Sequence, residues 1–492
     1  MLSSSSELAI ASAIRLGLYR TVTVSSRYEC KKRLGKGHLV RALSSIVSSQ
    51  AMLRVGIEAV DDARFLHFHS IDLSRHLFFE TLRTKRGEGE GGDCDDDELF
   101  RSKLQHFHDS TWEHAHLRPP WKVSVFYHDD DDDDDDKEKD VFCCDIVFAF
   151  HHSLADGISG RTFHQLLRRA LNNNKDKDEP VRKNEKLVLL FPAPLPSVIP
   201  APQEEAVPFS FSPSYWLKMH CIRLAANALA KPLNRYVNKV DDRANGSTLL
   251  LPINLSGCAA AALLAGCRSR KTTVTAVLHA LVLTSLSRRL PRGSSSSFKA
   301  ITAIDLRPYL DHRHGDDDDD ASSQFRLLVS AYQQGFSVSE DEEESIWDAA
   351  RIARVSLSAR RDSLPADDIF GMPSCLNQVF SSWIALYGKS NLRSWLLSNI
   401  GVLDDDDDDD DDDEDDDNDE DAFCRISRVT FVGMPFLHGG PPIFVSVASV
   451  AGGAMTVVVS WVQGVVPHEL ATGLADDLRA WITNFADKGK FL

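Results

Sequence analysis

The stretch VFCCDIVFAFHHSLADGISGRTFHQLLRRAL, residues 141–171, is the part of the sequence around which we predict the fold. Its first ten residues are mostly apolar and predict a buried strand. The segment HHSLADG at 151–157 ends this strand, and an amphipathic helix is expected after it. The apolar residues of the helix recur at i, i+3, i+4, i+7 and i+8: Phe163, Leu166, Leu167, Ala170 and Leu171. A strand end therefore brings two histidines, an aspartate and a glycine into one turn at the edge of a core.

The residue types in this turn favour a catalytic role for it. A histidine can act as a general base near neutral pH, because its unperturbed pKa is about 6.5. His151 and His152 are neighbours on extended backbone, so their side chains point to opposite faces and are not expected to share one role. Asp156 can fix the turn by bonding its own backbone or a distant arginine, and Gly157 permits backbone angles that other residues resist. The alternative is a pair of hydrogen-bonded histidines in an ordinary loop.

The pattern HHxxxDG resembles the active-site motif of the CoA-dependent acyltransferase superfamily. This superfamily includes chloramphenicol acetyltransferase, the plant BAHD enzymes and the condensation domains of peptide synthetases. The chain as a whole is most similar to the fungal alcohol acetyltransferases. Besides HHSLADG, this similarity rests on RLGLYRTVTV at 15–24, TVTAVLHAL at 273–281, IDLRPYL at 304–310, LSNIG at 397–401 and the C-terminal hairpin. The DFGWG signature of the plant enzymes is absent from the sequence, which argues against a plant-type member.

The resemblance implies an α/β fold of two chloramphenicol-acetyltransferase-like subdomains, each a mixed sheet with helices, with a tunnel at their interface. Acyl-CoA would enter from one face and the acceptor from the other. The resemblance also implies that His152 is the base and that Asp156 is structural, while His151 and Gly157 support the site. The expected divisions are an N-terminal subdomain at 1–171, a crossover linker with a helix at 172–245, and a C-terminal subdomain at 246–492.

Two further segments contribute candidate site residues. A strand predicted over 298–304 leads into Arg307, which we expect to pair with Asp156 in a charge-assisted, bidentate contact. Members of the superfamily commonly use such a pair. Ser398 and Asn399 follow a segment at 395–397 that we expect to be helical, and they could contact the donor or an oxyanion. For these two residues an ordinary turn is the alternative.

The net charge of −18 on 492 residues comes from three aspartate-rich runs, which look like loop insertions: 129–136, 316–320 and 404–421. The last two lie within the C-terminal subdomain. Without these 30 acids, 43 acidic residues remain against 55 basic ones, a balance of about +12. A mildly basic body suits a phosphate-rich donor such as CoA but does not identify one. Runs of like charge stay solvated, so we expect the insertions outside the core.

The nine cysteines form no CxxC pair, and we expect a reduced, intracellular protein without a secretory signal. Residues 441–466 carry no charge and imitate a membrane span in length. Two prolines open this segment and two glycines divide it, so we predict a hairpin of strands at 443–450 and 454–462 instead.

Together these features lead to the hypothesis of an acyltransferase that moves an acyl group, expected to be acetyl, from acyl-CoA to an alcohol. The alternatives are an N-acyltransferase or condensation-type enzyme that forms an amide, and a non-catalytic scaffold of the same fold. Acetyl-CoA is expected as a co-substrate, with no bound cofactor, no metal and no nucleic-acid partner. We expect a cytoplasmic monomer without a transmembrane segment. Peripheral contact with the endoplasmic reticulum or with lipid droplets stays open.

Overall fold

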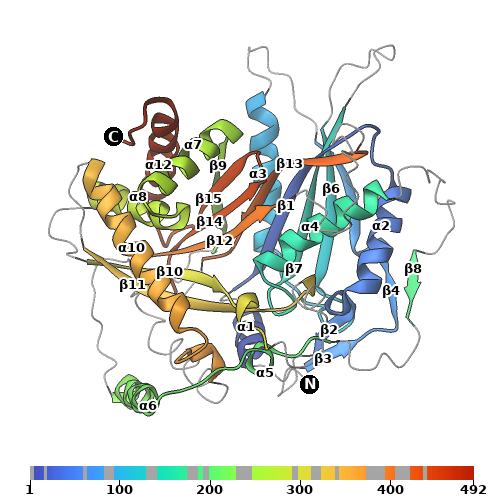
Figure 1. The fold of residues 1–492 in the computed structure, drawn as a ribbon. Coiled ribbons are helices and arrows are strands. Elements are labelled where there is room, and N and C mark those ends of the chain that lie inside the picture. The colour runs from blue at the N-terminus through green and yellow to red at the C-terminus, as the bar shows by residue number, and fades with distance from the viewer. Residues whose placement is uncertain are drawn as a thin grey trace, which may run out of the picture.

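The computed structural model describes residues 5–15, 19–58, 64–82, 93–128, 141–173, 187–191, 199–228, 246–290, 297–311, 323–337, 343–372, 394–404, 422–435 and 440–492. Apart from Asp404, the three aspartate runs lie outside the described residues. Two large mixed sheets with covering helices make up most of the described chain (Figure 1), which confirms the predicted α/β class. The predicted tunnel and the boundaries at 172 and 246 stay predictions.

The first sheet has five strands in the order β13-β1-β7-β6-β5. Its central strand β7 is the predicted apolar strand that leads to the two histidines. β7 pairs antiparallel with both neighbours, whereas β5 and β6 are parallel. The bounds are β1 Thr21–Cys30, β5 Leu77–Leu82, β6 Trp121–His128, β7 Phe142–His151 and β13 Cys424–Val432.

Helices α2 (Lys36–Ser49) and α4 (Gly157–Asn172) pack on one another beside this sheet (Figure 1). α4 is the helix that the apolar spacing after the histidines predicted, and it buries Phe163, Leu167 and Leu171 in the core. Helix α3 (Asp93–Asp109) contacts strands of both large sheets. Its Phe100 and Leu104 belong to a small hydrophobic cluster that also contains residues of these strands. The candidate turn therefore lies between the central strand of the first sheet and a helix packed beside it.

The second sheet has six strands in the order β11-β10-β12-β14-β15-β9. Its bounds are β9 Thr248–Leu255, β10 Ser297–Asp305, β11 Val329–Ser337, β12 Trp395–Leu403, β14 Ile443–Val450 and β15 Met455–Val462. The helices that pack against it or against each other are α7 Gly257–Ser269, α8 Val274–Arg289, α10 Glu343–Ser363 and α12 His468–Lys488 (Figure 1). The predicted C-terminal hairpin is confirmed as β14 and β15.

One local prediction is wrong. Residues 395–397 are not helical but begin β12, between β10 and β14. The three residues Trp395, Leu396 and Leu397 are all apolar, and so short an apolar run cannot be assigned to a strand or a helix by periodicity alone. Within the described residues, no helix has the length and apolar character needed to cross a membrane.

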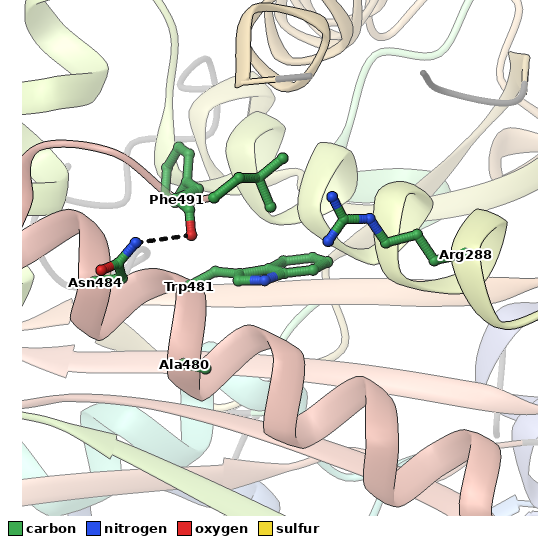
Figure 2. A pocket seen from close by; sticks show the side chains of 6 residues that line it. Arg288, Ala480, Trp481, Asn484 and Phe491 are labelled. Atoms are coloured by element: carbon green, nitrogen blue, oxygen red, sulfur yellow. Dashed lines mark hydrogen bonds between the residues drawn. The ribbon is translucent and has the colours of Figure 1, made fainter. Parts of the chain in front are cut away.

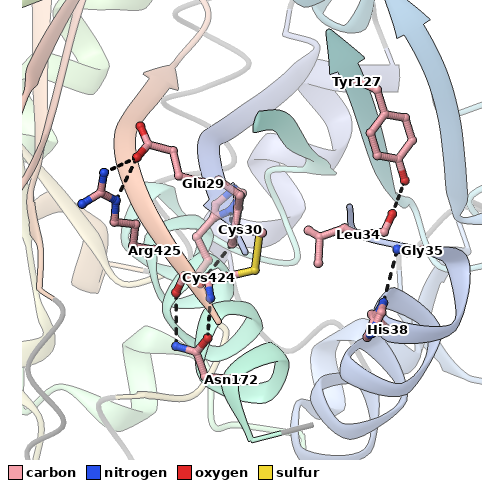
Figure 3. Close-up of a disulfide and its surroundings, with 11 residues drawn as sticks. Glu29, Cys30, Leu34, Gly35, His38, Tyr127, Asn172, Cys424 and Arg425 are labelled. Carbon is pink, nitrogen blue, oxygen red and sulfur yellow. Dashed lines mark hydrogen bonds and ion pairs between the residues drawn. A yellow bond between two sulfur atoms is a disulfide. The ribbon is translucent and has the colours of Figure 1, made fainter. Parts of the chain in front are cut away.

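Strand β13 follows β12 in the chain yet belongs to the first sheet, where it pairs with β1. Cys30 and Cys424 face each other in this pairing and form a disulfide across 394 residues (Figure 3). The expectation of reduced cysteines is therefore wrong for this pair, because sequence spacing carries no information on such a distant contact. The side chain of Asn172, the last residue of α4, bonds both the N–H and the carbonyl of Cys424. The crossing strand is thus tied to the helix that follows the histidines.

The smaller elements complete the fold. They are α1 Ser5–Arg15, β2 Val55–Glu58, β3 Arg64–His67, β4 Ser70–Asp72, β8 Val188–Leu190, α5 Gln203–Ala206 and α6 Pro213–Ala228. Short 3₁₀ helices lie at Ala51–Arg54, Leu73–Arg75, Arg307–Tyr309 and Ile369–Gly371. The helix predicted within the 172–245 segment corresponds to α6.

Candidate active site

The two histidines at the end of β7 have different surroundings, as their alternation on the strand predicted. His151 is the last residue of β7 and is buried. Its ring Nδ1 accepts a hydrogen bond from the backbone N–H of Ser153 at 3.2 Å. Burial, with a smaller effect from neighbouring His152, lowers the pKa of His151 to about 3. His151 is therefore a neutral side chain that shapes the turn.

His152, unlike His151, is only half-buried. Its Nδ1 lies 2.8 Å from the carbonyl oxygen of Ala155. Because a carbonyl only accepts, Nδ1 must carry the proton, and Nε2 is left with its lone pair. The ring stacks on Tyr19, with ring centroids 5.5 Å apart. The turn thus fixes both the tautomer and the plane of this imidazole.

Burial lowers the pKa of His152 below its ordinary value, and the Ala155 carbonyl and the charge of Asp156 only partly offset this. The unprotonated imidazole is therefore the form present at neutral pH. A neutral ring has the properties of a general base when its tautomer is fixed and its Nε2 makes no hydrogen bond among the described residues, as here.

Asp156 is the N-cap residue of α4, and its side chain is buried. Its Oδ1 accepts from the backbone N–H of Ser159 at 2.8 Å, and its Oδ2 accepts from the N–H of Leu328 at 3.0 Å. Arg307 binds both carboxylate oxygens, with Nη1 2.9 Å from Oδ2 and Nη2 3.1 Å from Oδ1. The predicted bidentate pair is present, and both side chains are less than a tenth exposed.

The opposite charges of Asp156 and Arg307 each stabilise the ionised form of the other. Burial alone would raise the pKa of Asp156, but the charge and hydrogen bonds of Arg307 outweigh it, so the pKa lies below its usual value. Arg307 also donates to Asp305 at 3.1 Å and to the Ser159 hydroxyl at 3.1 Å. The pair connects the start of α4 with the segment after β10, and so fixes the turn to the second sheet.

Gly157 sits where two side chains leave no room for a Cβ. An added Cβ would lie 2.6 Å from Ile400 Cγ2 and 3.1 Å from the ring of Phe431. Ile400 belongs to β12 and Phe431 to β13, so the glycine allows the start of α4 to approach both strands.

Gly157→Ala is expected to lower the free energy of unfolding by about 1–3 kcal/mol, because overpacking a filled contact forces its neighbours apart. The measurement is the urea midpoint of the purified variant. Gly335→Ala is the matched control, since a Cβ there would meet nothing nearer than 4.0 Å. Equal midpoints for the two variants would contradict the packing argument.

Ser398 and Asn399 lie on β12 and not in a turn. The Asn399 amide donates to the Thr275 hydroxyl at 3.2 Å and accepts from the Gly401 N–H at 2.9 Å, where the pairing of β12 with β14 is irregular. Next to it, Arg161 of α4 donates to the Ile400 carbonyl at 2.7 Å. The segment therefore lies beside the start of α4, but the amide of Asn399 is already engaged.

One cavity of the molecule lies away from this site. It measures about 550 Å³ and is formed by Arg288 of α8 with Trp481 and Asn484 of α12 and the last two residues of the chain (Figure 2). Arg288 stacks over the Trp481 ring at 5.1 Å. None of the predicted site residues lines it. Among the described residues, no group of three or more histidine, cysteine, aspartate or glutamate side chains is placed to hold a metal ion.

A family model described as alcohol acetyltransferase matches residues 95–408, which is more than half of the chain and includes the histidine turn. The chain belongs to the alcohol acetyltransferase family. It is therefore an acyltransferase, as the motif predicted. A similar relative is the "probable alcohol acetyltransferase FCK4" of Fusarium pseudograminearum, which is 25% identical over 500 residues that cover 98% of this chain and 93% of the relative.

Solved structures confirm the fold of this alcohol acetyltransferase family member. A trichothecene 15-O-acetyltransferase, TRI3 from Fusarium sporotrichioides, superposes with a TM-score of 0.66 at 12% identity, covering 98% of this chain and 94% of that one. The condensation domain of the monacolin K polyketide synthase MokA superposes with a TM-score of 0.55 at 10% identity, covering 99% and 98%. The two-sheet architecture is therefore shared with condensation-domain folds.

Sequence reasoning did not assign a role to Tyr19 or Ser159. Tyr19 lies in the RLGLYRTVTV segment, and burial raises the pKa of its hydroxyl strongly. Its stacking on His152 has no local sequence signal, because 133 residues separate them. Ser159 could have been found from the pattern itself, since a residue three positions after an N-cap aspartate commonly donates to it.

Proposed function

We propose that this protein transfers an acetyl group from acetyl-CoA to the hydroxyl of a small-molecule alcohol, with His152 as general base. The observation that supports this most directly is the fixed tautomer of His152, whose Nδ1–H is bound to Ala155 and whose Nε2 is unprotonated. A general base must hold its lone pair toward the reacting proton, and His152 is not fully buried. The alcohol acetyltransferase family supplies the reaction class.

In the proposed reaction, Nε2 of His152 takes the hydroxyl proton as the alcohol oxygen attacks the thioester carbonyl. The carbonyl becomes tetrahedral and then collapses, which breaks the carbon–sulfur bond. The same imidazolium returns its proton to the departing thiolate, so that ester and free thiol are the products. A positioned base contributes on the order of 10² to 10⁴ in rate. Binding both substrates side by side contributes much of the remainder.

Asp156 and Arg307 hold the turn in this proposal and do not touch substrate. The carboxylate is occupied by Ser159, Leu328 and Arg307, so it has no free lone pair directed at the imidazole in the described contacts. Tyr19 helps to set the plane of the His152 ring through stacking.

The rate is expected to stay high at pH values where an ordinary histidine would already be protonated. Since burial lowers the pKa of His152, the neutral base persists below its unperturbed pKa of about 6.5. The acid limb of kcat/KM, which reports the free enzyme, should have its midpoint below that value. Profiles recorded between pH 4 and 8 measure this directly, and a midpoint at or above 6.5 would be inconsistent with the proposed base.

The function itself is tested by measuring thiol release from acetyl-CoA across a panel of alcohols and amines. Release with at least one alcohol, and ester detected by mass spectrometry, is the expected outcome. Amide formation with amines alone would replace the proposal by N-acylation. Absence of release with every acceptor, in protein shown to be folded, would favour a non-catalytic scaffold.

A further inference from the structure

A second cavity lies between the end of α3 and the start of β6 and has a different chemical character. It measures about 210 Å³, and the residues that matter for its chemistry are Trp112, Glu113, His114, Arg118, Pro120 and Lys122. A water molecule takes about 30 Å³ of liquid volume, so the cavity has room for a compact polyatomic ion with water. It is lined by two cations that lie close together.

Within the part of the chain that the structure describes, no acid neutralises Lys122 or Arg118. Among the described residues, neither side chain makes an ion pair within 4.0 Å. Burial, and then the charge of Arg118, lower the pKa of Lys122. Glu113 is the acid of this cavity, but it is exposed and its carboxylate accepts from the Thr111 hydroxyl at 3.3 Å. The two cations therefore repel each other in a partly desolvated place.

An aromatic residue and an unused donor lie at the same cavity. The Lys122 ammonium is 5.5 Å from the centre of the Trp112 ring, a cation–π contact that holds the lysine over the indole. The buried indole N–H of Trp112 has no acceptor among the described residues. A buried donor without a partner is costly, so an acceptor at this cavity would relieve it.

The cavity is adjacent to the histidine turn. Pro120, which lines the cavity, accepts a hydrogen bond at its carbonyl from the backbone N–H of His151 at 2.9 Å. Lys122 is paired with Ala149, two residues before His151 on β7. A ligand in this cavity would thus lie one strand away from the candidate base.

We propose that this cavity binds a phosphate group, with Lys122 and Arg118 as its cationic ligands. Two cations match the charge of a phosphate monoester, which is close to −2 at neutral pH. Arginine binds phosphate oxygens in a bidentate manner and lysine binds them as a point charge. The group belongs either to the phosphates of a CoA-type donor or to a free phosphorylated small molecule. The inference concerns binding and does not depend on the proposed acyl transfer.

Calorimetric titration of the full chain with inorganic phosphate and with pyrophosphate, at low ionic strength, tests the proposal. Saturable binding is expected for the wild type. Lys122→Met and Arg118→Gln should each raise Kd at least about tenfold, because each removes a charge-assisted hydrogen bond. Lys122→Arg should bind within a few-fold of wild type. Lys488→Gln, an exposed lysine at the end of α12, is the matched control and should leave Kd unchanged.

Three outcomes would overturn the proposal: no saturable heat with wild type, equal Kd for Lys122→Met and Lys488→Gln, or acetate binding as tightly as phosphate. Two further measurements identify the molecule that supplies the phosphate group. Competition of CoA with inorganic phosphate, together with weaker CoA binding by Lys122→Met, supports the donor as the source. Phosphate binding that CoA leaves unchanged supports a separate phosphorylated ligand. Each variant is first compared with wild type by circular dichroism, so that loss of fold is recognised separately.

Discussion

Replacing His152 by alanine is expected to lower kcat by about 10²- to 10⁴-fold, the contribution of one positioned base. The loss is expected in folded protein, because the ring makes one hydrogen bond to a backbone carbonyl, one stacking contact with Tyr19, and is half-buried. Thiol release from acetyl-CoA with an alcohol acceptor measures the rate, and thermal unfolding measures the fold. KM for acetyl-CoA should change much less than kcat, since the base acts in the transition state.

His106→Ala is the matched control, because His106 is an exposed histidine on α3 whose ring makes no hydrogen bond recorded among the described residues. This variant should keep wild-type kcat. If His152→Ala retained wild-type turnover while folded, His152 would not be the base. If both variants lost activity equally, the effect would come from fold and not from chemistry.

The centre of the site could be predicted from the sequence because it is local. The strand follows from a mostly apolar run and the helix from the helical spacing of apolar residues over 141–171, and the structure confirms them as β7 and α4 with the turn between them. The pairing of Asp156 with Arg307 was also predicted, although 151 residues separate them. The prediction rested on the position of the arginine at a strand end and on the resemblance to a superfamily whose members commonly use such a pair.

The features that sequence did not reveal depend on contacts between distant segments. Strand β13 joins the first sheet and its Cys424 pairs with Cys30, which only the register of β1 and β13 brings together. Residues 395–397 were misassigned because three consecutive apolar residues show no alternation that would distinguish a strand from a helix. The stacking of Tyr19 on His152 likewise requires the turn to fold back onto the start of β1.

The second large effect is a loss of stability on replacing Asp156 by alanine. Asp156→Ala should lower the free energy of unfolding by about 3–5 kcal/mol, because removing one partner of a buried ion pair leaves the other uncompensated. The Arg307 side chain is 8% exposed, and among the described residues the acid left to it would be the more exposed Asp305. The N–H groups of Ser159 and Leu328 would also lose their acceptor. Activity should fall as well, since the turn that orients His152 loses its anchor.

Asp72→Ala is the matched control, because Asp72 caps a short helix and pairs with Arg75 at 3.6 Å on the surface. Exposed pairs contribute at most about 1 kcal/mol, so this variant should change stability little. Urea unfolding at pH 7 compares the two. Equal losses would show that the Asp156–Arg307 pair has no special role in the fold.

The pH dependence provides an independent check on the same pair. Because Arg307 and the backbone donors hold the pKa of Asp156 below its unfolded value of about 3.9, the carboxylate contributes stability above that value. The contribution is lost as pH falls through the lower, folded pKa. The difference in stability between wild type and Asp156→Asn should therefore be largest near neutral pH and should shrink below about pH 4. A difference that stayed constant down to pH 3 would mean that the lost stability comes from packing and hydrogen bonding, and not from the charge of the pair.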